Sequence, residues 1–502
     1  MRIDTIFMRS ALIALPILLL TLVCQAQEKP NIIFFLVDDM GWQDTSVPFH
    51  TSQTQLNQDY RTPNMERLAG KGLLFTNAYA CAICSPSRIS LMTGQNAARH
   101  GVTCWTLRKD TSPENSHKTL TPADWPLNGL QPEGTEIPRS FASVTLPQRL
   151  QASGYRTIHA GKAHFGAKDT PGADPTNLGF DVNIAGSYMG GPGSYHGDKN
   201  FSAVWRDGQA IWDVPGLEKY HGQEINLTEA ITRESISAVE KAVDENSPFY
   251  LYLSHYAIHA PFEPDRRFLP NYQDKKWSEH QKVLASMIES MDHSLGDILD
   301  MVDRLKIADN TIILFMSDNG SPANNPQNKP LKGHKIYGYE GGTRVPFIAY
   351  WPGKTPGNQR TDSPIIIEDL YPTILELAGI DVTEKIDGVS FKEVLTNPEE
   401  NRSDRPLFWH YPNLYHRPPY SAVRMGAFKF IYWHADQNLE LFDIKNDIGE
   451  TQNLAAKHPE KAKELATVLT KHLKDTGAYM LIDKQTNRPV PYPNQVIPAP
   501  DE

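Results

Sequence analysis

The chain has 502 residues, of which 40% are hydrophobic and 22% are charged. This balance is typical of globular proteins, and the length permits either one large α/β domain with a subdomain or two to three smaller domains. The formal net charge is −10, which excludes a broadly basic surface of the kind that binds nucleic acid. An anionic substrate would therefore need local clusters of basic residues.

The first 26 residues have the pattern of a secretory signal peptide. Two arginines precede an apolar run at 11–23, and Cys24-Gln25-Ala26 follows it, so we expect cleavage after Ala26 and a periplasmic or secreted protein. The run is short for a bilayer, so we expect no stable membrane span. A lipoprotein anchor at Cys24 is the alternative, although Val23 stands where such anchors have a small residue.

Three apolar runs are predicted to be strands buried on both faces of a parallel sheet. These runs span residues 30–37, 248–253 and 311–316. Each is followed by polar residues, which are Asp38 and Asp39, then His255 and His259, then Asp318 and Asn319. Because such residues line the ligand crevice of open α/β sheets, we expect them to meet at one place.

Further elements follow from periodicity and turn residues. Residues 103–143 are polar and aperiodic, which predicts a long functional loop or a disordered one. Helices are predicted at 282–305, where apolar residues recur at spacings of three and four, and at 365–378. A polar stretch at 397–405 is predicted to be a linker. Short strands are expected after it at 421–425, 428–432 and 439–442, followed by a helix at about 458–474.

The run Cys84-Ser85-Pro86-Ser87-Arg88-Ile89-Ser90-Leu91-Met92-Thr93-Gly94 carries the most specific signal in the chain. Ser85 is suited to cap a helix, Pro86 to its first turn and Gly94 to its end. The Cys84 side chain is then expected at a helix N-terminus, which favours a bound anion, with Arg88 pointing back toward it. On local grounds alone, a capped helix with a buried thiol is the alternative.

The same run resembles the signature of the type I, formylglycine-dependent sulfatases of the alkaline-phosphatase-like superfamily. In that family the cysteine is oxidised after synthesis to formylglycine. The resemblance therefore implies formylglycine at Cys84 and a formylglycine-generating maturation enzyme as a partner. Met92 and Gln95 depart from the usual pattern, but neither is a chemical residue.

Three other segments resemble the same family. Gly161-Lys162-Ala163-His164-Phe165-Gly166 is similar to its Gly-Lys-Trp-His-Leu-Gly segment, which implies that Lys162 binds sulfate and that His164 contacts the formylglycine hydrate. His259 matches the histidine that faces the leaving oxygen, and spacing from a Glu-Gly-Gly block selects Lys335 as a sulfate ligand. Without the resemblance, a surface lysine and a satisfied histidine are the ordinary interpretations.

The resemblance also implies a calcium site. Its ligands would be Asp38, Asp39, Cys84 in its modified form, Asp318 and Asn319. Adjacent aspartates alone are more often turn residues. Three carboxylates buried at neighbouring strand ends are costly without a cation, however, and oxygen ligands suit a hard ion such as Ca²⁺. The remaining cysteines of a processed chain, Cys81 and Cys104, are compatible with a disulfide or with two buried thiols.

The resemblance covers nearly the whole mature chain and implies an α/β fold like that of alkaline phosphatase. Such a fold has a large mixed sheet flanked by helices and a smaller C-terminal α+β subdomain with an antiparallel sheet and one helix. The expected boundaries are 1–26 for the signal peptide, 27–396 for the sulfatase catalytic domain, 397–405 for the linker and 406–502 for the C-terminal subdomain.

The implied activity is that of a sulfuric ester hydrolase. Arg88, Lys162 and Lys335 would hold the sulfate oxygens together with calcium. His259 would protonate the leaving oxygen, and His164 would accept the proton of the second hydroxyl of the formylglycine hydrate, so that sulfate is released.

The substrate is predicted from residues outside these motifs. Aromatic residues suited to stack on sugars are Trp105, Trp125, Trp409, Tyr411 and Tyr415, and extra substrate-binding cations are His416, Arg417 and Arg424. They favour a sulfated carbohydrate derived from a polysaccharide. Small aryl sulfates, and phosphonate or phosphate esters of the same superfamily, are the alternatives. A non-catalytic sulfated-glycan binder is the alternative from another class, and the intact signature argues against it.

Overall fold

The computed structural model describes residues 29–322 and 328–497. The expected signal peptide and the alternative anchor at Cys24 lie outside these residues. Among the helices that are described, none combines the length and the apolar character needed to cross a membrane.

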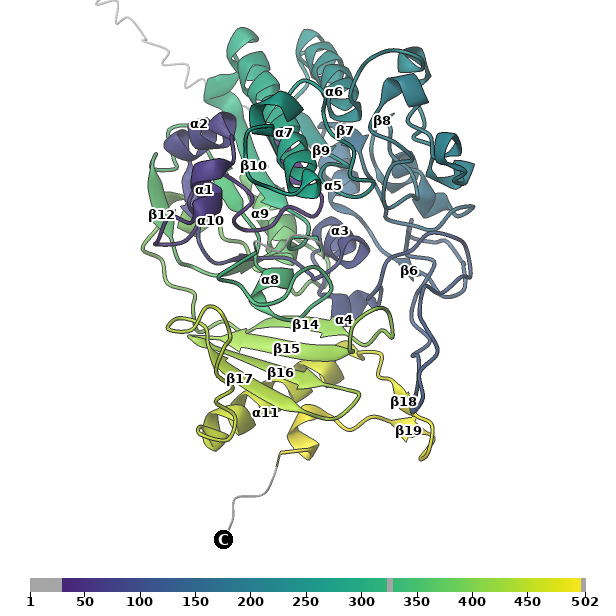
Figure 1. Ribbon diagram of the computed structural model, residues 1–502, viewed down its shortest axis with the longest axis vertical. Coiled ribbons are helices and arrows are strands. Elements are labelled where there is room, and N and C mark those ends of the chain that lie inside the picture. The colour runs from purple at the N-terminus through teal and green to yellow at the C-terminus, as the bar shows by residue number, and fades with distance from the viewer. Residues whose placement is uncertain (1–28, 323–327, 498–502) are drawn as a thin grey trace, which may run out of the picture.

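A mixed sheet of eight strands forms the centre of the larger domain (Figure 1). Its order is β12 (Gln359–Thr361), β2 (Leu73–Phe75), β11 (Phe347–Tyr350), β10 (Thr311–Ser317), β1 (Asn31–Val37), β9 (Phe249–Ser254), β7 (Arg156–Gly161) and β8 (Val182–Ile184). Of these eight, β11 alone runs against the others. The three predicted buried strands are the adjacent, parallel β10, β1 and β9, so their carboxyl ends meet at one edge.

Both faces of the sheet are covered by helices. Alternate residues of β1 belong to different cores, with Ile32, Phe34 and Leu36 on one face and Ile33, Phe35 and Val37 on the other. The first face is covered by α3 (Cys84–Thr93), α5 (Leu146–Ala152) and α9 (Leu370–Leu377). The second is covered by α2 (Pro63–Lys71), α6 (Leu227–Asp244) and α7 (Glu279–Arg304). This double burial explains why the central strands are continuous apolar runs.

The C-terminal part forms a separate antiparallel sheet with one helix. The strands β14 (Leu407–Tyr411), β15 (Tyr420–Met425), β16 (Phe428–Trp433) and β17 (Leu439–Asp443) pair in sequence order, and α11 (Pro459–Thr476) packs on them. The expected α+β arrangement is confirmed, but the sequence did not reveal β14. Residues 397–405 contain no helix or strand.

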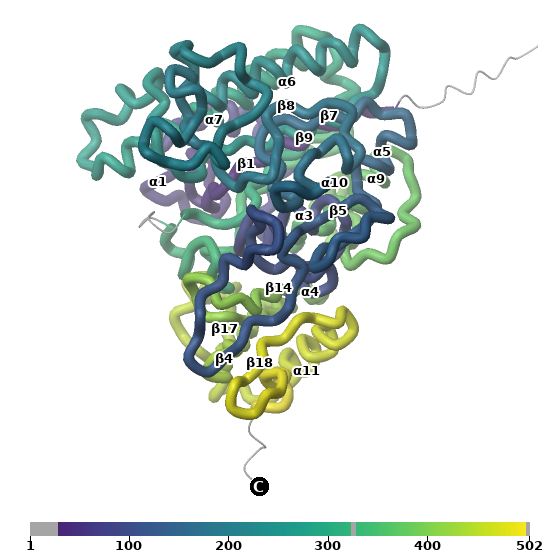
Figure 2. Tube along the Cα trace, turned by 90° about the vertical axis from the view of Figure 1, so that its right-hand side faces the viewer, coloured from purple at the N-terminus to yellow at the C-terminus, as the bar shows by residue number. Residues whose placement is uncertain are grey.

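The predicted loop at 103–143 is packed rather than disordered. Its short strand β4 (Leu120–Thr121) pairs with β18 (Ile482–Asp483), which also pairs with β19 (Arg488–Pro489) near the C-terminus (Figure 2). Two further short strands, β5 (Leu130–Gln131) and β6 (Phe141–Ala142), pair with each other. The segment therefore connects the large domain to the C-terminal end of the chain.

Two helix boundaries differ from those predicted. In α3 the residue that precedes the helix is Ile83, and Ser85 lies inside the helix, where its hydroxyl accepts a hydrogen bond from the Thr106 amide at 3.4 Å. Gly94 ends this helix in the left-handed conformation, as expected. The predicted helix at 365–378 begins later. Its first residues form β13 (Ile365–Ile366), which pairs with β3 (Ala78–Tyr79).

The other short helices are α1 (Gln55–Asp59), α4 (Ala97–His100), α8 (Glu340–Thr343) and α10 (Lys392–Thr396).

Two adjacent acidic residues, Glu368 and Asp369, are buried between α3 and the start of α9. Arg405 forms a two-pronged ion pair with Asp369, whose carboxylate oxygens lie 2.6 Å from the two guanidinium nitrogens. Its neighbour Glu368 has no ion pair with a described cation, and one of its oxygens accepts a hydrogen bond from Asn96 at 2.7 Å. Burial, followed by the charge of Asp369, raises the pKa of Glu368 from 4.5 to about 8.

We expect Glu368→Gln to change how stability depends on pH. Between about 4.5 and 8 the folded state holds a proton on Glu368 that the unfolded chain releases, so its contribution to stability falls as the pH rises, by at most about 1.4 kcal/mol per pH unit. Glutamine keeps the bond to Asn96 and cannot ionise. Denaturant unfolding at pH 5.5 and 8 measures this, with the exposed Glu399→Gln as control. An identical slope in wild type and Glu368→Gln would contradict a raised pKa.

Candidate active site

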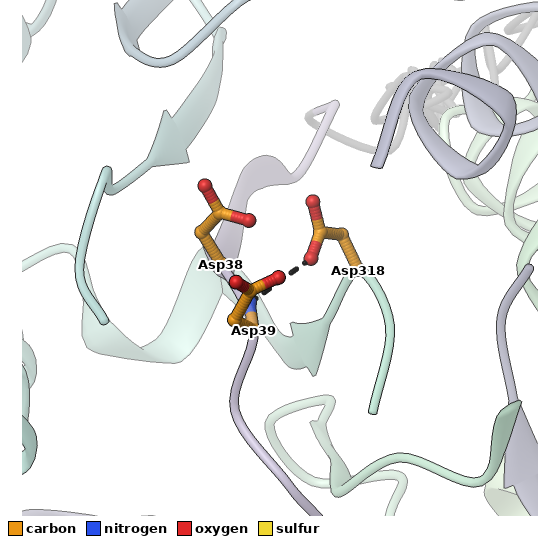
Figure 3. A group of neighbouring side chains, drawn as sticks. All are labelled: Asp38, Asp39 and Asp318. Carbon is orange, nitrogen blue, oxygen red and sulfur yellow. Dashed lines mark hydrogen bonds between the residues drawn. The ribbon is translucent and has the colours of Figure 1, made fainter. Parts of the chain in front are cut away.

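Three carboxylates meet at the edge of the sheet (Figure 3). Asp38 and Asp39 follow β1, Asp318 follows β10, and all three are buried. One oxygen from each lies within 4.8 Å of the others. The backbone N–H of Asp39 donates to Asp318 at 3.2 Å. Parallel pairing of two strands distant in sequence thus brings the carboxylates together, as predicted.

Three cations surround this group of acids. The ion pairs are Arg88 with Asp318 at 2.8 Å, Lys162 with Asp38 at 2.5 Å and Lys335 with Asp39 at 2.5 Å. The Arg88 and Lys162 side chains are fully buried, and that of Lys335 is 13% exposed. The cations come from α3, from the end of β7 and from the segment before α8, so one charged cluster joins several parts of the fold.

The acids differ in their protonation. Burial raises the pKa of Asp38 well above its usual range, and the neighbouring Asp318 adds to this effect. Burial also opposes ionisation of Asp39, but the adjacent Lys335 and His259 hold its pKa well below the usual range. Neighbouring buried carboxyl groups rarely all ionise, because the negative charge of one raises the pKa of the next.

The cluster fits a hard metal ion. Asp38 Oδ1 and Asn319 Oδ1 are buried and accept no hydrogen bond, although the Asn319 side-chain N–H donates to Asp39 at 2.8 Å. Buried acceptors without a hydrogen bond are satisfied when a cation lies between them. An all-oxygen set of this kind suits Ca²⁺ better than a softer transition metal.

A cavity of about 420 Å³ lies beside these charges. Its polar wall consists of Asp39, Cys84, His164, His259 and Lys335. Cys84 is the first residue of α3, so it lies where the free amide groups of the helix favour an anion. Burial raises the pKa of its thiol, and an unmodified cysteine here is therefore protonated at neutral pH.

Both histidines are oriented by backbone carbonyl groups. His164 Nε2 lies 2.7 Å from the Thr106 oxygen, and His259 Nδ1 lies 2.7 Å from the Ala260 oxygen. Since a carbonyl only accepts, these nitrogens carry the hydrogen. The free nitrogens are His164 Nδ1, which has no partner, and His259 Nε2, which is 3.9 Å from Asp39. Burial lowers the pKa of His259 to about 3 and that of His164 well below its usual range.

Four aromatic residues also line the cavity. Trp105 and Tyr415 lie with their ring centroids 5.7 Å apart, and Trp212 and Phe262 are the other two. Trp105 comes from the 103–143 segment, and Tyr415 from the loop between β14 and β15.

Three predicted stacking residues belong to the core instead. Trp125, Trp409 and Tyr411 are only 1%, 2% and 3% exposed. The Trp409 and Tyr411 side chains are buried because they lie on β14, the strand that the sequence did not reveal.

The three predicted substrate-binding cations lie in different places. His416 is exposed and follows Tyr415 directly. The Arg417 guanidinium lies 4.8 Å from the Tyr337 ring and 3.3 Å from His334, next to the Lys335 segment. The prediction that Arg424 binds substrate at this site is corrected, because Arg424 does not line the Cys84 cavity. It lies on β15 and lines a separate cavity.

Sequence reasoning missed several residues of the site. Ser254 ends β9 and accepts a hydrogen bond from Arg88 at 2.6 Å. Gly190 and Gly191 pack against the two histidine rings, since a Cβ at these positions would lie 2.6 Å from His164 and 2.7 Å from His259. The glycine-rich run at 190–193 was the signal available for them. Cys81 and Cys104 are buried free thiols, not a disulfide.

Comparison with known proteins gives consistent matches. The Sulfatase family model matches residues 30–380, and a model of the C-terminal region of N-sulphoglucosamine sulphohydrolase matches residues 334–478. N-acetylgalactosamine-6-sulfatase of Homo sapiens is 30% identical, with 86% of this chain and 76% of that protein covered. A sulfatase of Formosa agariphila is 28% identical, with 87% and 86% covered.

Solved structures show the same fold. The crystal structure of Ps i-CgsB superposes with a TM-score of 0.72 at 29% identity and covers 89% of this chain and 94% of that chain. The structure of Ps i-CgsB in complex with k-i-k-neocarrahexaose also has a TM-score of 0.72, at 28% identity, with 93% and 96% covered. The expected large mixed sheet with a C-terminal antiparallel subdomain is thereby confirmed. Together with the family model, which spans well over half of the sequence, these matches show that the chain belongs to the sulfatase family of sulfuric ester hydrolases.

Proposed function

We propose that this sulfatase removes sulfate from a sulfated carbohydrate, specifically an oligosaccharide derived from a polysaccharide. The observation that carries the proposal is the composition of the Cys84 cavity. A polar floor, with Asp39 and Lys335 charged and two histidines neutral, adjoins a wall that contains several aromatic rings. The floor suits a sulfate group, and the aromatic wall suits the apolar face of a sugar ring.

The floor supplies charge that is already in position. In the mature site, Cys84 would be formylglycine, and the hydrate of that aldehyde would provide the attacking hydroxyl. Calcium would draw charge from the sulfate oxygens, and its ligands would be Asp38, Asp39, Asp318, Asn319 and residue 84. Lys162 and Lys335 neutralise charge on the sulfate. Arg88 holds Asp318 and the end of β9 in place through its bonds to Asp318, Ser254 and the Lys162 carbonyl. Positioned charges of this kind stabilise a transition state without reorganisation.

The two histidines move protons in this proposal. His259 is assigned to the leaving oxygen because its Nε2 lies beside Asp39 in the cavity. Nε2 must first bind a proton, which the negative charge of Asp39 favours, before it can donate that proton to the leaving oxygen. His164 serves the second hydroxyl at residue 84, since its Nδ1 has no hydrogen-bond partner and its other nitrogen is fixed on Thr106. Fixed ring orientation is what general acid–base catalysis requires.

The aromatic residues of the Cys84 cavity and the similar sulfatases both favour a carbohydrate substrate over a small aryl sulfate. Trp105, Trp212 and Tyr415 provide flat surfaces around a volume within the range of roughly 300–1,000 Å³ usual for small-ligand sites. One similar protein is named N-acetylgalactosamine-6-sulfatase, and another was solved in complex with k-i-k-neocarrahexaose. His416 and Arg417 are assigned to anionic groups farther along the glycan, because they adjoin Tyr415.

The proposal extends to maturation, export and domain boundaries. A formylglycine-generating enzyme would act on Cys84 before the chain folds around it, since that side chain is buried in the folded protein. The signal-peptide pattern at 1–26 supports a periplasmic or secreted location. The boundaries at 27–396, 397–405 and 406–502 agree with the position of the C-terminal sheet.

Purified protein from a maturation-competent host is expected to release sulfate from a sulfated oligosaccharide. Its kcat/KM should exceed that for a small aryl sulfate by about tenfold or more, because only the sugar contacts the whole aromatic wall. Cys84→Ala should abolish both reactions, and the buried Cys81→Ala, which lies outside the cavity, should retain them.

Sulfate release by ion chromatography and peptide mass spectrometry of residue 84 measure the two parts of this prediction. Equal activity in wild type and Cys84→Ala would overturn the mechanism. A preference for the aryl sulfate would remove the carbohydrate assignment alone.

Gly190→Ala is expected to lower kcat by about 10- to 100-fold without unfolding the protein. A methyl group at this position would lie 2.6 Å from the His164 ring and would displace it, and small misplacements of catalytic groups have effects of this size. Gly70→Ala is the matched control, because a Cβ there meets nothing within 4 Å. Steady-state kinetics together with thermal melting decide the outcome. Wild-type kcat in Gly190→Ala would show that the position of His164 is unimportant.

A further inference from the structure

A second cavity, of about 560 Å³, is lined by residues of the large domain and of the C-terminal sheet. Among the described residues it shares no lining residue with the Cys84 cavity. Segments from both parts of the chain form it. They include Trp42 from the loop after β1, Arg344 after α8, Arg424 on β15 and Lys445 after β17.

Arg424 is the least satisfied charge of this cavity. It is 6% exposed, its Nε is buried without a partner, and no described residue accepts a hydrogen bond from its guanidinium. Its contact is with the face of the Tyr79 ring, 5.3 Å away. The nearby Glu340 is already occupied, because its oxygens accept hydrogen bonds from Lys429 at 2.8 Å, Tyr79 at 2.8 Å and Arg344 at 3.1 Å. Of the three guanidinium nitrogens of Arg424 only Nε is buried, so the two terminal nitrogens are open to the cavity and can donate to an acceptor that a ligand brings.

A second unsatisfied donor lines the same cavity. The Trp42 indole Nε1 is buried and has no acceptor among the described residues, and the ring lies 4.4 Å from the Arg344 guanidinium. Arg344 itself is fully bonded, to Glu340, the Thr76 carbonyl and Asn77. Indole and guanidinium groups only donate. Neither Trp42 Nε1 nor Arg424 Nε has enough exposed surface to touch a ligand, so the donors that can reach one are the terminal guanidinium nitrogens of Arg424 and the Lys445 ammonium group.

The charge around the cavity has the matching sign. Arg344, Arg424 and Lys445 line it, whereas Asp362 is the one carboxylate among its described lining residues. Lys445 is exposed, so it can reach a ligand that enters from solvent.

We infer that this cavity is a second ligand site, which binds an oxyanion, either a free inorganic anion or the sulfate or carboxylate group of an acidic sugar. The planar guanidinium of Arg424 matches two oxygens of such a group, and Lys445 adds a flexible point charge at the entrance. The site is separate from the catalytic floor and does not depend on the proposed reaction.

Calorimetric titration with two probes, inorganic sulfate and glucuronate, tests this assignment. At least one probe should bind wild type about tenfold or more tightly than it binds Arg424→Met, because a charge-assisted hydrogen bond is lost. Loss for sulfate alone identifies an inorganic anion, and loss for glucuronate identifies an acidic sugar. Wild type and Arg424→Met both keep the Cys84 cavity, so any sulfate bound there contributes equally to the two titrations.

A surface variant guards against misfolding of Arg424→Met. Lys445→Glu reverses a charge at the entrance and should also weaken binding, whereas Lys463→Glu makes the same change on an exposed face of α11 and should have no effect. Circular dichroism and thermal melting establish that each variant is folded. If neither probe binds wild type, or if Lys445→Glu and a folded Arg424→Met bind both probes as tightly as wild type, the inference is overturned.

Discussion

The structure depends on the burial of three carboxylates at the ends of two adjacent parallel strands. Asp38, Asp39 and Asp318 lie where water cannot stabilise their charge, and such burial is tolerated only with cations or a metal ion. Three cations from other segments form ion pairs with these carboxylates, namely Arg88, Lys162 and Lys335. The same charges that balance the acids also define where a sulfate group can be held, so folding and recognition share one electrostatic cause.

The arrangement around this cluster follows from that requirement. Arg88 pairs with Asp318 from one turn inside α3, which places Cys84 at the helix N-terminus beside the acids. The histidines are fixed from outside the cluster by carbonyl groups, and Gly190 and Gly191 leave just enough room for their rings. Reactive groups from distant segments therefore occupy defined positions before any ligand arrives.

The sequence predicted the features that local rules govern. Continuous apolar runs indicated β1, β9 and β10, and the polar residues after them indicated the cluster. Residues in irregular loops, such as Trp212 and Gly190, left no periodic signal. Arg424 and Trp409 were misplaced for a different reason: composition shows that aromatic and basic residues are present, but only strand pairing shows which way they point. Trp409 pairs with Ala422 and Arg424 with Leu407, so both lie on one face of the sheet. Trp409 lies in the middle of its strand within the core, whereas Arg424 lies near the end of β15 and lines the second cavity.

Metal content tests the central claim most directly, namely that the carboxylate cluster is built around a cation. Elemental analysis of the purified, dialysed protein should find about one calcium per chain. Asp39→Asn should lose the calcium and the hydrolytic activity together, while the exposed Asp309→Asn should keep both. A wild-type protein that hydrolyses sulfate esters at full rate with no bound divalent metal would contradict the account.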